Sequence, residues 1–290
     1  MNLTLRQLAV FAATARLNRI TRAAEELCMT QSAASQSIKE LETILGYQIF
    51  DRLGRKLQVN ENGKAILSRV TQMLELQAEL QQPVSTKLQG QLKVAASVTI
   101  SSYLMPAILA DFIQQYPQVE PDLYIGNSDE VIAKLMAGKA HIGLIEAPIM
   151  HEHLSISPWR TDKLAVFCAS DHPLATSGKI SVQTMSKQRW ILRESGSGTR
   201  SVFVSAMQQQ GGFIENSMGL ARQEAIKQAV KANLGLGVLS ILSIQQELRL
   251  GKFKQLKTPL NLNRQFSIVQ SEHYQHNQMV ISFRDFIQAD

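Results

Sequence analysis

Ser195-Gly196-Ser197-Gly198-Thr199-Arg200 is the stretch whose residue types could most directly bind a ligand. A helix is expected to begin here, and the glycines would let backbone N–H groups converge on one point. The hydroxyls add donors and Arg200 adds a positive charge, so a small anion could be held. An ordinary capped helix start with flexible glycines would fit the same residues, and the motif alone does not separate these two interpretations.

Other polar side chains follow predicted strands elsewhere in the same part of the chain. They are Ser97, Thr99, Asn127 and Glu146. Ligands of open α/β sheets bind beyond the carboxyl ends of strands, where helices begin. These side chains are therefore candidates for one small-anion site together with Ser197, Gly198 and Thr199.

Alternating strands and helices would position that site. Apolar runs predict strands at 92–97, 120–127, 140–146, 163–170, 189–192, 217–221, 235–241, 253–256 and 266–271. Helical periodicity predicts helices at 102–116, 129–137, 197–210, 223–232, 243–250 and 278–288. This order implies a parallel sheet with helices on both faces. It also divides into two similar lobes, about 90–162 with 266–290 and about 163–265, joined by two crossings with a cleft between them.

A different polar surface lies near the N-terminus, on a helix predicted at 31–45. Ala34, Ile38, Leu41 and Leu45 recur at spacings of three and four and form its apolar face. The opposite face carries Gln31, Ser32, Ser35 and Gln36. Such short polar side chains suit the reading of base edges in a DNA major groove. An ordinary helical hairpin would share the pattern.

Neighbouring segments would complete a DNA-binding head. A helix at 20–27 and a turn at 28–30, which includes Thr30, would form a helix-turn-helix with helix 31–45, and a helix at 3–17 would cover its back. Arg22, near a helix start, could hold a phosphate. Residues 53–59 predict a short hairpin around Gly54. Its flanking cations are Arg52, Arg55 and Lys56, which would reach DNA, although a solvated turn has the same composition.

A long amphipathic helix from residue 62 or 63 to about 82 follows the head. Its apolar residues lie near heptad spacing and have no neighbouring partner in the sequence. The simplest partner is the same helix of a second subunit, which would pair two DNA-binding heads for two half-sites. A polar hinge is expected at 84–90. The domain boundaries would then be 1–60, 61–89 and 90–290.

Composition agrees with a DNA-binding protein that stays in the cytoplasm. The net charge is +6, and residues 1–60 hold eight cations against five anions. No apolar run of about 18 residues indicates a membrane span, and the N-terminus resembles a folded helix rather than a signal peptide. Cys28 and Cys168 lie far apart and are expected to be buried and unpaired, with a redox-sensing pair as the alternative.

In this arrangement the chain resembles a LysR-type transcriptional regulator over nearly its full length. The most specific similarity is AAEELCMTQSAASQSIKELETILGYQIFDR at 23–52, continued by GRKLQVNENG at 54–63. The resemblance implies a winged helix-turn-helix, a linker-helix dimer that commonly forms a tetramer, and a periplasmic-binding-protein-like α/β effector domain. It implies DNA contacts at Gln31, Ser32, Ala33, Ser35 and Gln36, and effector contacts at Ser97, Thr99, Asn127, Glu146, Gly198 and Thr199. An inverted-repeat promoter site and RNA polymerase are the further expected partners, and no cofactor or metal is expected.

A narrower resemblance is to the branch with regulators of carbon fixation and of sulfite or sulfur assimilation. The similar motifs are SVTISSYLMP, IGNSDEVI, IGLIEAP and LRESGSGTR. Ser32 and Gln36 depart from the Pro and the basic residue that are common in the family, and these differences should alter base preference. Val204 stands where many members of the branch have Glu. An inorganic oxyanion or a small carboxylate fits the donors present.

Two other classes of protein compete with a regulator. An α/β enzyme with an accessory DNA-binding head would need a nucleophile, a base or a metal cluster, yet no G-x-S-x-G motif occurs and the histidines are scattered. A solute-binding protein would need a signal peptide and would have no use for a DNA-binding head. The sequence therefore favours a regulator whose promoter binding responds to a small anion between the lobes.

Overall fold

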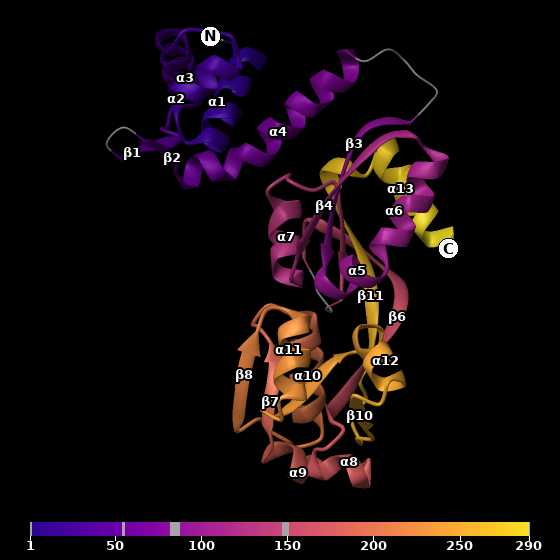
Figure 1. The fold of residues 1–290 in the computed structure, drawn as a ribbon. Coiled ribbons are helices and arrows are strands. Elements are labelled where there is room, and N and C mark those ends of the chain that lie inside the picture. Colours follow the sequence, from indigo (N-terminus) through magenta and orange to yellow (C-terminus); the bar gives the residue numbers. More distant parts are fainter. Residues whose placement is uncertain (1, 54–55, 82–87, 147–150, 290) are drawn as a thin grey trace. The chain divides into compact units, whose positions relative to one another are not determined.

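The computed structural model describes residues 2–53, 56–81, 88–146 and 151–289. The chain divides into two compact units, Met1–Lys87 with Met136–Lys139, and Leu88–Leu135 with Ala140–Asp290. The first unit is mostly helical and the second is α/β (Figure 1). Across the described ranges, no helix has the length and apolar character that a membrane span requires.

The first unit begins with three helices that form the predicted helix-turn-helix and its cover. They are α1 (Leu5–Leu17), α2 (Ile20–Glu26) and α3 (Gln31–Leu45). A capping box starts α1: the Thr4 hydroxyl accepts from the Gln7 N–H, and the Gln7 side chain accepts from the Thr4 N–H. Leu8 and Phe11 of α1 are buried in the core that all three helices share.

Helix α3 has the bounds that its apolar periodicity predicts. Thr30 caps its start by accepting from the Ala33 N–H, and Gly46 ends it in the left-handed conformation at φ 80°. Ala23 and Ala34 are fully buried, so small side chains stand where α2 and α3 approach each other. The helix-turn-helix prediction is confirmed.

The predicted wing is present as an antiparallel hairpin of β1 (Phe50–Leu53) and β2 (Lys56–Val59). Residues 54–55, at its turn, lie outside the described part of the chain. Helix α4 (Glu61–Gln81) then starts one residue before the predicted range. Most of the predicted hinge at 84–90 lies outside the described residues, and its last two positions are wrong, because strand β3 already begins at Gln89.

The apolar residues of α4 are buried in its first half and exposed in its second half. Val70 is buried in the head core, and Ile66 and Leu74 pack against that core. Leu76 and Leu80, farther along, are 52% and 87% exposed. The prediction that these apolar residues lack a partner within their own chain is therefore wrong for the first half of the helix. That half packs on the head and completes its core.

The second unit is built on a mixed sheet. Among the described residues its strands run in the order β4-β3-β5-β11-β6-β9-β7-β8, with β10 paired to β6. The strands are β3 (Gln89–Ser97), β4 (Gln118–Gly126), β5 (Ile142–Ile145), β6 (Leu154–Ala169), β7 (Arg189–Arg193), β8 (Asn216–Leu220), β9 (Leu236–Ser240), β10 (Phe253–Leu256) and β11 (Asn263–Ser271). We call the part around β3, β4 and β5 the first lobe and the part around β7 to β10 the second lobe. Strands within each set of three, β3-β4-β5 and β7-β8-β9, are parallel as predicted.

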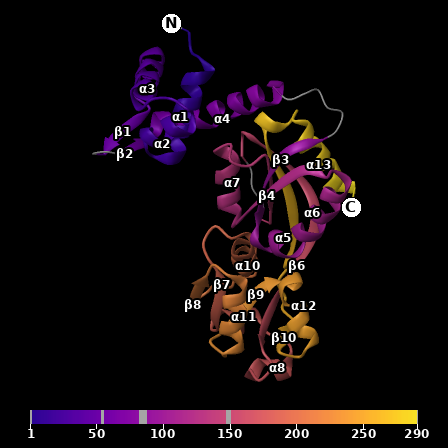
Figure 2. The same ribbon diagram turned by 45° about the horizontal axis from the view of Figure 1, so that its top comes forward.

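Strands β6 and β11 cross between the lobes, side by side and antiparallel (Figures 1 and 2). The prediction of a purely parallel sheet is therefore wrong for these two strands, which pair antiparallel with their neighbours. Both are also longer than predicted. The first half of β6 is half-exposed and polar, so the sequence there lacks the apolar run that marks its second half.

The helices of the second unit cover both faces of the sheet. The predicted helix at 102–116 is instead two helices, because the chain breaks at Leu104 and Pro106 lies at the start of the second one. The described helices are α5 (Val98–Tyr103), α6 (Met105–Gln115), α7 (Ser128–Met136), α8 (Pro173–Ser177), α9 (Val182–Ser186), α10 (Gly198–Gln209), α11 (Gln223–Lys231), α12 (Ile241–Arg249), the 3₁₀ turn η1 (Glu272–Tyr274) and α13 (Gln278–Ala289). Phe112 and Phe283 fill the core of the first lobe, and Trp190 and Phe203 that of the second.

The two cysteines are free and differ sharply in their surroundings. Cys28 is exposed, contrary to the expectation of burial, whereas Cys168 on β6 is fully buried. Burial, with a smaller contribution from the negative charge of Asp171, raises the pKa of the Cys168 thiol to about 11.

Native protein treated with a thiol reagent at neutral pH is therefore expected to be labelled at Cys28 alone. Cys168 should react only after denaturation, because it is both inaccessible and protonated in the folded state. Peptide mass spectrometry after timed labelling measures both rates. Labelling of Cys168 in native protein as fast as that of Cys28 would contradict this assignment.

Candidate functional site

Polar residues predicted at the strand ends lie in one buried layer where the two lobes meet. The members that are at most 1% exposed are Ser97, Thr99, Glu146, Ser197 and Thr199. Ser97 ends β3 and Glu146 follows β5, and parallel pairing of Ala96 with Leu144 brings these strand ends together. Thr99 lies in the first turn of α5, directly after Ser97, and Ser197 and Thr199 belong to the start of α10 in the second lobe. We call this set, together with the buried charged side chains around it that are described next, the interlobe layer.

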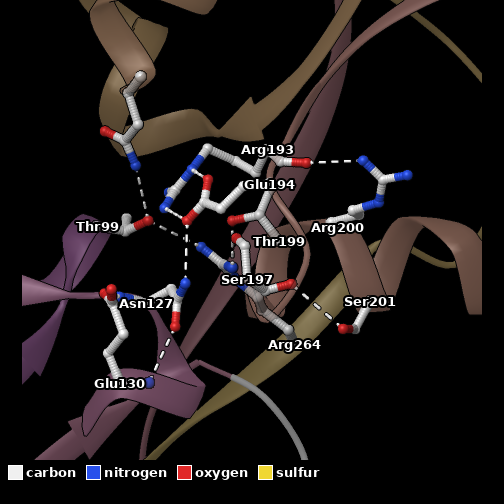
Figure 3. Close-up of polar contacts among 11 residues, drawn as sticks. Thr99, Asn127, Glu130, Arg193, Glu194, Ser197, Thr199, Arg200, Ser201 and Arg264 are labelled. Atoms are coloured by element: carbon white, nitrogen blue, oxygen red, sulfur yellow. Dashed lines mark hydrogen bonds and ion pairs between the residues drawn. The ribbon is translucent and has the colours of Figure 1, made fainter. Parts of the chain in front are cut away.

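Arg264 of β11 links the interlobe layer across the lobes (Figure 3). Its Nη1 donates to Thr199 Oγ1 at 3.0 Å and its Nη2 to Thr99 Oγ1 at 3.4 Å. Asp162 Oδ2 lies 2.7 Å from Arg264 Nε and 2.6 Å from Nη2. Glu146 Oε2 lies 2.8 Å from Arg264 Nη2. One buried guanidinium thus holds hydroxyls of both lobes, and two carboxylates lie against it.

These contacts also fix the direction in which the threonine hydroxyls can donate. Thr99 Oγ1 accepts from Gln223 Nε2 at 2.9 Å as well as from Arg264. A hydroxyl has one donor and two acceptor positions, so the Thr99 O–H must be directed at another partner. Thr199 Oγ1 likewise accepts from Arg264. Within the described residues neither hydroxyl donates a hydrogen bond, so both donors remain available to a ligand.

Several buried polar atoms of the layer have no hydrogen-bond partner in the described part of the chain. They are Ser97 Oγ, Ser197 Oγ, Arg193 Nη1 and Glu146 Oε2, together with Ser128 Oγ at the start of α7. Glu146 Oε2 is within ion-pair distance of Arg264, but the guanidinium N–H is not aligned to form a hydrogen bond with it. A buried polar group without a partner costs about 1–3 kcal/mol. Such a concentration in one layer indicates a place where a bound molecule completes the hydrogen bonding.

A second polar link between the lobes involves Asn127. Arg193, at the end of β7, donates to both carboxylate oxygens of Glu194 at 2.8 and 2.7 Å. Asn127 Nδ2 donates to Glu194 Oε1 at 3.4 Å (Figure 3). Burial alone would raise the pKa of Glu194, but the hydrogen bonds and positive charge of Arg193 outweigh it and keep that pKa below the ordinary value.

Arg200 does not take the role that the sequence motif gave it. Its Nη1 donates to the backbone oxygen of Arg193 at 3.0 Å, on a different side of α10 from the Thr199 hydroxyl (Figure 3). The expectation that Arg200 supplies the positive charge of the anion site is therefore wrong. Buried positive charge in the layer comes instead from Arg264 and Arg193.

Sequence reasoning missed the residues that organise this layer from a distance. They are Asp162, Arg193, Glu194, Gln223 and Arg264. One local signal was present: Arg264 alternates with Phe266 and Ile268 along β11, so a charge occupies a strand face that is otherwise apolar and buried. A charge at such a position needs buried partners and is a candidate for function.

Across the described ranges, no group of three or more His, Cys, Asp or Glu side chains is placed so that it could hold a metal ion. His151 and His153 are exposed beyond β5, with ring centroids 6.1 Å apart.

The head presents its predicted reading residues at the start of α3. Gln31, Ser32 and Gln36 are exposed, whereas Ala33 and Ser35 are half-buried. A groove of about 660 Å³ runs along this surface and is lined by Gln31, Ser32, Ser35, Gln36, Lys39 and, from the wing, Asp51 and Leu57.

The predicted phosphate contacts are described only in part. Arg22 is exposed on α2, and Thr30 is exposed while it caps α3. The side chains of Arg52 and Lys56 and the whole of Arg55 lie outside the described residues. The arrangement of α2, α3 and the wing is that of a winged helix-turn-helix.

A DNA-binding head followed by a two-lobed unit with a buried polar layer defines a ligand-responsive DNA-binding protein. The family model described as the bacterial regulatory helix-turn-helix protein of the lysR family matches residues 5–64, and the LysR substrate binding domain model matches residues 85–290. The chain belongs to the LysR family of transcriptional regulators. The family members to which it is similar are transcriptional regulators. This chain is likewise a transcriptional regulator and not an enzyme.

Curated relatives place it in the branch that the sequence motifs indicated. It is 37% identical to the uncharacterized transcriptional regulator YeiE of Escherichia coli K12 over 90% of this chain and 88% of that protein. It is 33% identical to the RuBisCO operon transcriptional regulator of Allochromatium vinosum, over 86% and 83% of the two chains. Identity to CysL of Bacillus subtilis is 30%, over 83% and 82%.

Solved structures show the same fold. Full-length OxyR of Pseudomonas aeruginosa matches 99% of this chain and 95% of its own with a TM-score of 0.80, at 22% identity. The regulatory domain of CcmR from Synechocystis, solved in complex with 2-PG, matches 69% of this chain and 97% of its own. Its TM-score is 0.64 and its identity 26%.

Proposed function

We propose that the regulator binds a small anion in the interlobe layer and that this binding controls its hold on promoter DNA. The observation that carries the proposal is the set of buried donors without partners at Ser97, Ser197 and Arg193. The available hydroxyl protons of Thr99 and Thr199 add to them. Asn127 and Gly198 border the same layer. A small ligand bound in the regulatory domain of CcmR, a structural neighbour, supports the same use of this domain.

Ligand binding here would act on the relative positions of the two lobes. Thr99 belongs to the first lobe and Thr199 to the second, and both are joined to Arg264 on a strand that crosses between them. An anion that accepts hydrogen bonds from both threonines would favour the closed arrangement. The anion can control DNA binding only if the open and closed arrangements of the lobes differ in affinity for the anion and also in affinity for DNA.

The DNA contacts we propose are those on the exposed side of the helix-turn-helix and on the wing. They are Arg22, Thr30, Gln31, Ser32, Ala33, Ser35, Gln36, Arg52, Arg55 and Lys56. The protein would act in the cytoplasm as a dimer through α4, whose Met73, Leu76 and Leu80 are exposed apolar residues, and as a tetramer of two dimers. Paired heads would read an inverted repeat and bend the DNA between them, next to RNA polymerase.

The anion site is tested by replacing Thr199 with valine, which keeps the shape of the side chain and removes its hydroxyl. A ligand of the native state raises the melting temperature. Sulfate, inorganic phosphate and small carboxylates are screened on the full chain, and the shift produced by any hit is expected to be lost in the Thr199→Val variant. Thr176→Val, on the exposed face of α8, is the matched control and should keep the shift. If a ligand still raised the melting temperature of the Thr199→Val variant, that ligand would bind at a different site.

A further inference from the structure

Glu146 stands out in the interlobe layer because one oxygen of its carboxylate, an acceptor, is buried without a hydrogen bond. We propose that Glu146 makes the site selective for an oxyanion that carries its own hydroxyl group, such as hydrogen phosphate, over a fully deprotonated anion, such as sulfate. This proposal rests on the proposed anion site and names the class of ligand that the site takes. The preference arises because the ligand's O–H would donate to the Glu146 carboxylate.

The hydrogen bonds of Asp162 show that Glu146 is not needed simply to neutralise Arg264. Asp162 Oδ2 lies 2.7 and 2.6 Å from Arg264 Nε and Nη2, and Asp162 Oδ1 accepts from Ser240 Oγ at 2.8 Å. Both oxygens of Asp162 therefore have partners, and one of them is the guanidinium. Glu146 Oε2, by contrast, is buried beside Arg264 without an aligned hydrogen bond. A carboxylate oxygen in that condition is an acceptor that a donor on a ligand could satisfy.

The position of Glu146 brings it to the same end of the sheet as the donors. It directly follows β5, whose Leu144 pairs with Ala96, and Ser97 with its unpartnered hydroxyl ends β3. Arg264 contacts Glu146 and also donates to Thr99 and Thr199. A tetrahedral anion held by the hydroxyls of both lobes would therefore lie next to Glu146.

The charge of the layer supports the same preference. Its charged groups are the guanidiniums of Arg193 and Arg264 and the carboxylates of Glu146, Asp162 and Glu194, which leaves one negative charge in excess. A fully deprotonated dianion would face this excess charge and the Glu146 oxygen that lacks a hydrogen bond at short range, where screening by water is weak. A ligand that keeps a proton replaces that repulsion with a hydrogen bond to the carboxylate.

Sulfate and inorganic phosphate provide a matched pair of probes, since both are tetrahedral and of similar size, and only phosphate keeps a proton near neutral pH. Isothermal titration of the full chain is expected to show phosphate binding at least about tenfold more tightly than sulfate, the factor expected for one charge-assisted hydrogen bond. In Glu146→Gln, the amide can donate, so sulfate should gain affinity and phosphate should lose its advantage. Glu120→Gln is the control: it makes the same change at an exposed residue of β4, away from the strand ends that form the site, and should preserve the preference.

A second measurement needs no variant and covers the case in which Glu146→Gln does not fold. Monofluorophosphate has the shape of hydrogen phosphate with a fluorine in place of the hydroxyl, so at the same pH the wild-type protein should bind it about as weakly as sulfate and more weakly than phosphate. Equal affinities for sulfate and phosphate, unchanged by Glu146→Gln but abolished by Thr199→Val, would overturn the role of Glu146 and leave the anion site standing. Anion binding that is indifferent to Thr199→Val would overturn the site and the selectivity together.

Discussion

Replacing Arg264 with alanine is expected to lower the free energy of unfolding of the second unit by about 3–5 kcal/mol, the usual cost of breaking a buried ion pair by removing one partner. The side chains of Arg264, Asp162 and Glu146 are 2%, 4% and 2% exposed. The substitution leaves both carboxylates buried without their cation and also removes the donor shared by Thr99 and Thr199. Four buried polar side chains therefore lose a partner through this one change.

Chemical denaturation followed by tryptophan fluorescence measures this loss, because both tryptophans, Trp159 and Trp190, belong to the second unit. Arg284→Ala is the matched control. Arg284 pairs with Asp285 on the surface of α13, and an exposed pair contributes less than about 1 kcal/mol. If Arg264→Ala cost no more than Arg284→Ala, the ion pairs of Arg264 could not be the link that holds the layer together.

Adding Asp162→Asn to Arg264→Ala sharpens the interpretation. The second change removes one of the two carboxylates that the first change leaves unpaired, so part of the lost stability should return. A cavity left by the arginine would instead remain in the double variant, and the loss would persist. The double variant therefore separates a charge effect from a packing effect at the same position.

The head could be predicted from the sequence because its determinants are local. The spacing of Ala34, Ile38 and Leu41 gives α3 its buried face, Thr30 caps it, and Gly46 ends it, all within a 17-residue window. The predicted bounds of α3 therefore agree with the structure at both ends. The break of the predicted helix at 102–116 was missed because Pro106 is also compatible with the first turn of a single helix.

The interlobe layer could be predicted only where its residues sit in local motifs. Thr199 lies in a glycine-rich helix start and Thr99 directly after a strand, and both signals are visible in a short stretch of sequence. Arg264 lies 65 positions from Thr199, 165 from Thr99 and 102 from Asp162. Its role arises from two crossing strands whose pairing no local pattern reveals. The motif pointed to Arg200 as the cation because Arg200 was the nearest arginine in sequence.

On the DNA-binding side, Gln36→Ala is expected to cost about 1–3 kcal/mol of discrimination at one base pair, the usual value of a side chain that reads a base edge. The Gln36 side chain is oriented by hydrogen bonds, since its Nε2 donates to Glu40 Oε1 at 3.0 Å and Gln7 Nε2 donates to Glu40 Oε2 at 3.1 Å. This chain of hydrogen bonds keeps the amide nitrogen toward Glu40 and the carbonyl oxygen outward. An outward acceptor suits a base that presents an amino group, which adenine and cytosine do in the major groove.

Arg22→Ala provides the contrast that identifies a base contact. A phosphate contact carries no sequence information, so its loss should weaken all sites by a similar factor and lower the slope of log affinity against log salt by about one.

Binding is measured by fluorescence anisotropy on a site selected from random DNA and on single-base variants of it, with Gln114→Ala, exposed in the second unit, as control. We expect Gln36→Ala to lose discrimination between bases without a change in the salt slope. We expect Arg22→Ala to lower the salt slope without a loss of discrimination. If Gln36→Ala weakened every site equally and lowered the salt slope, its departure from the basic residue common in the family would not determine base preference, and that determination would pass to Gln31 and Ser32.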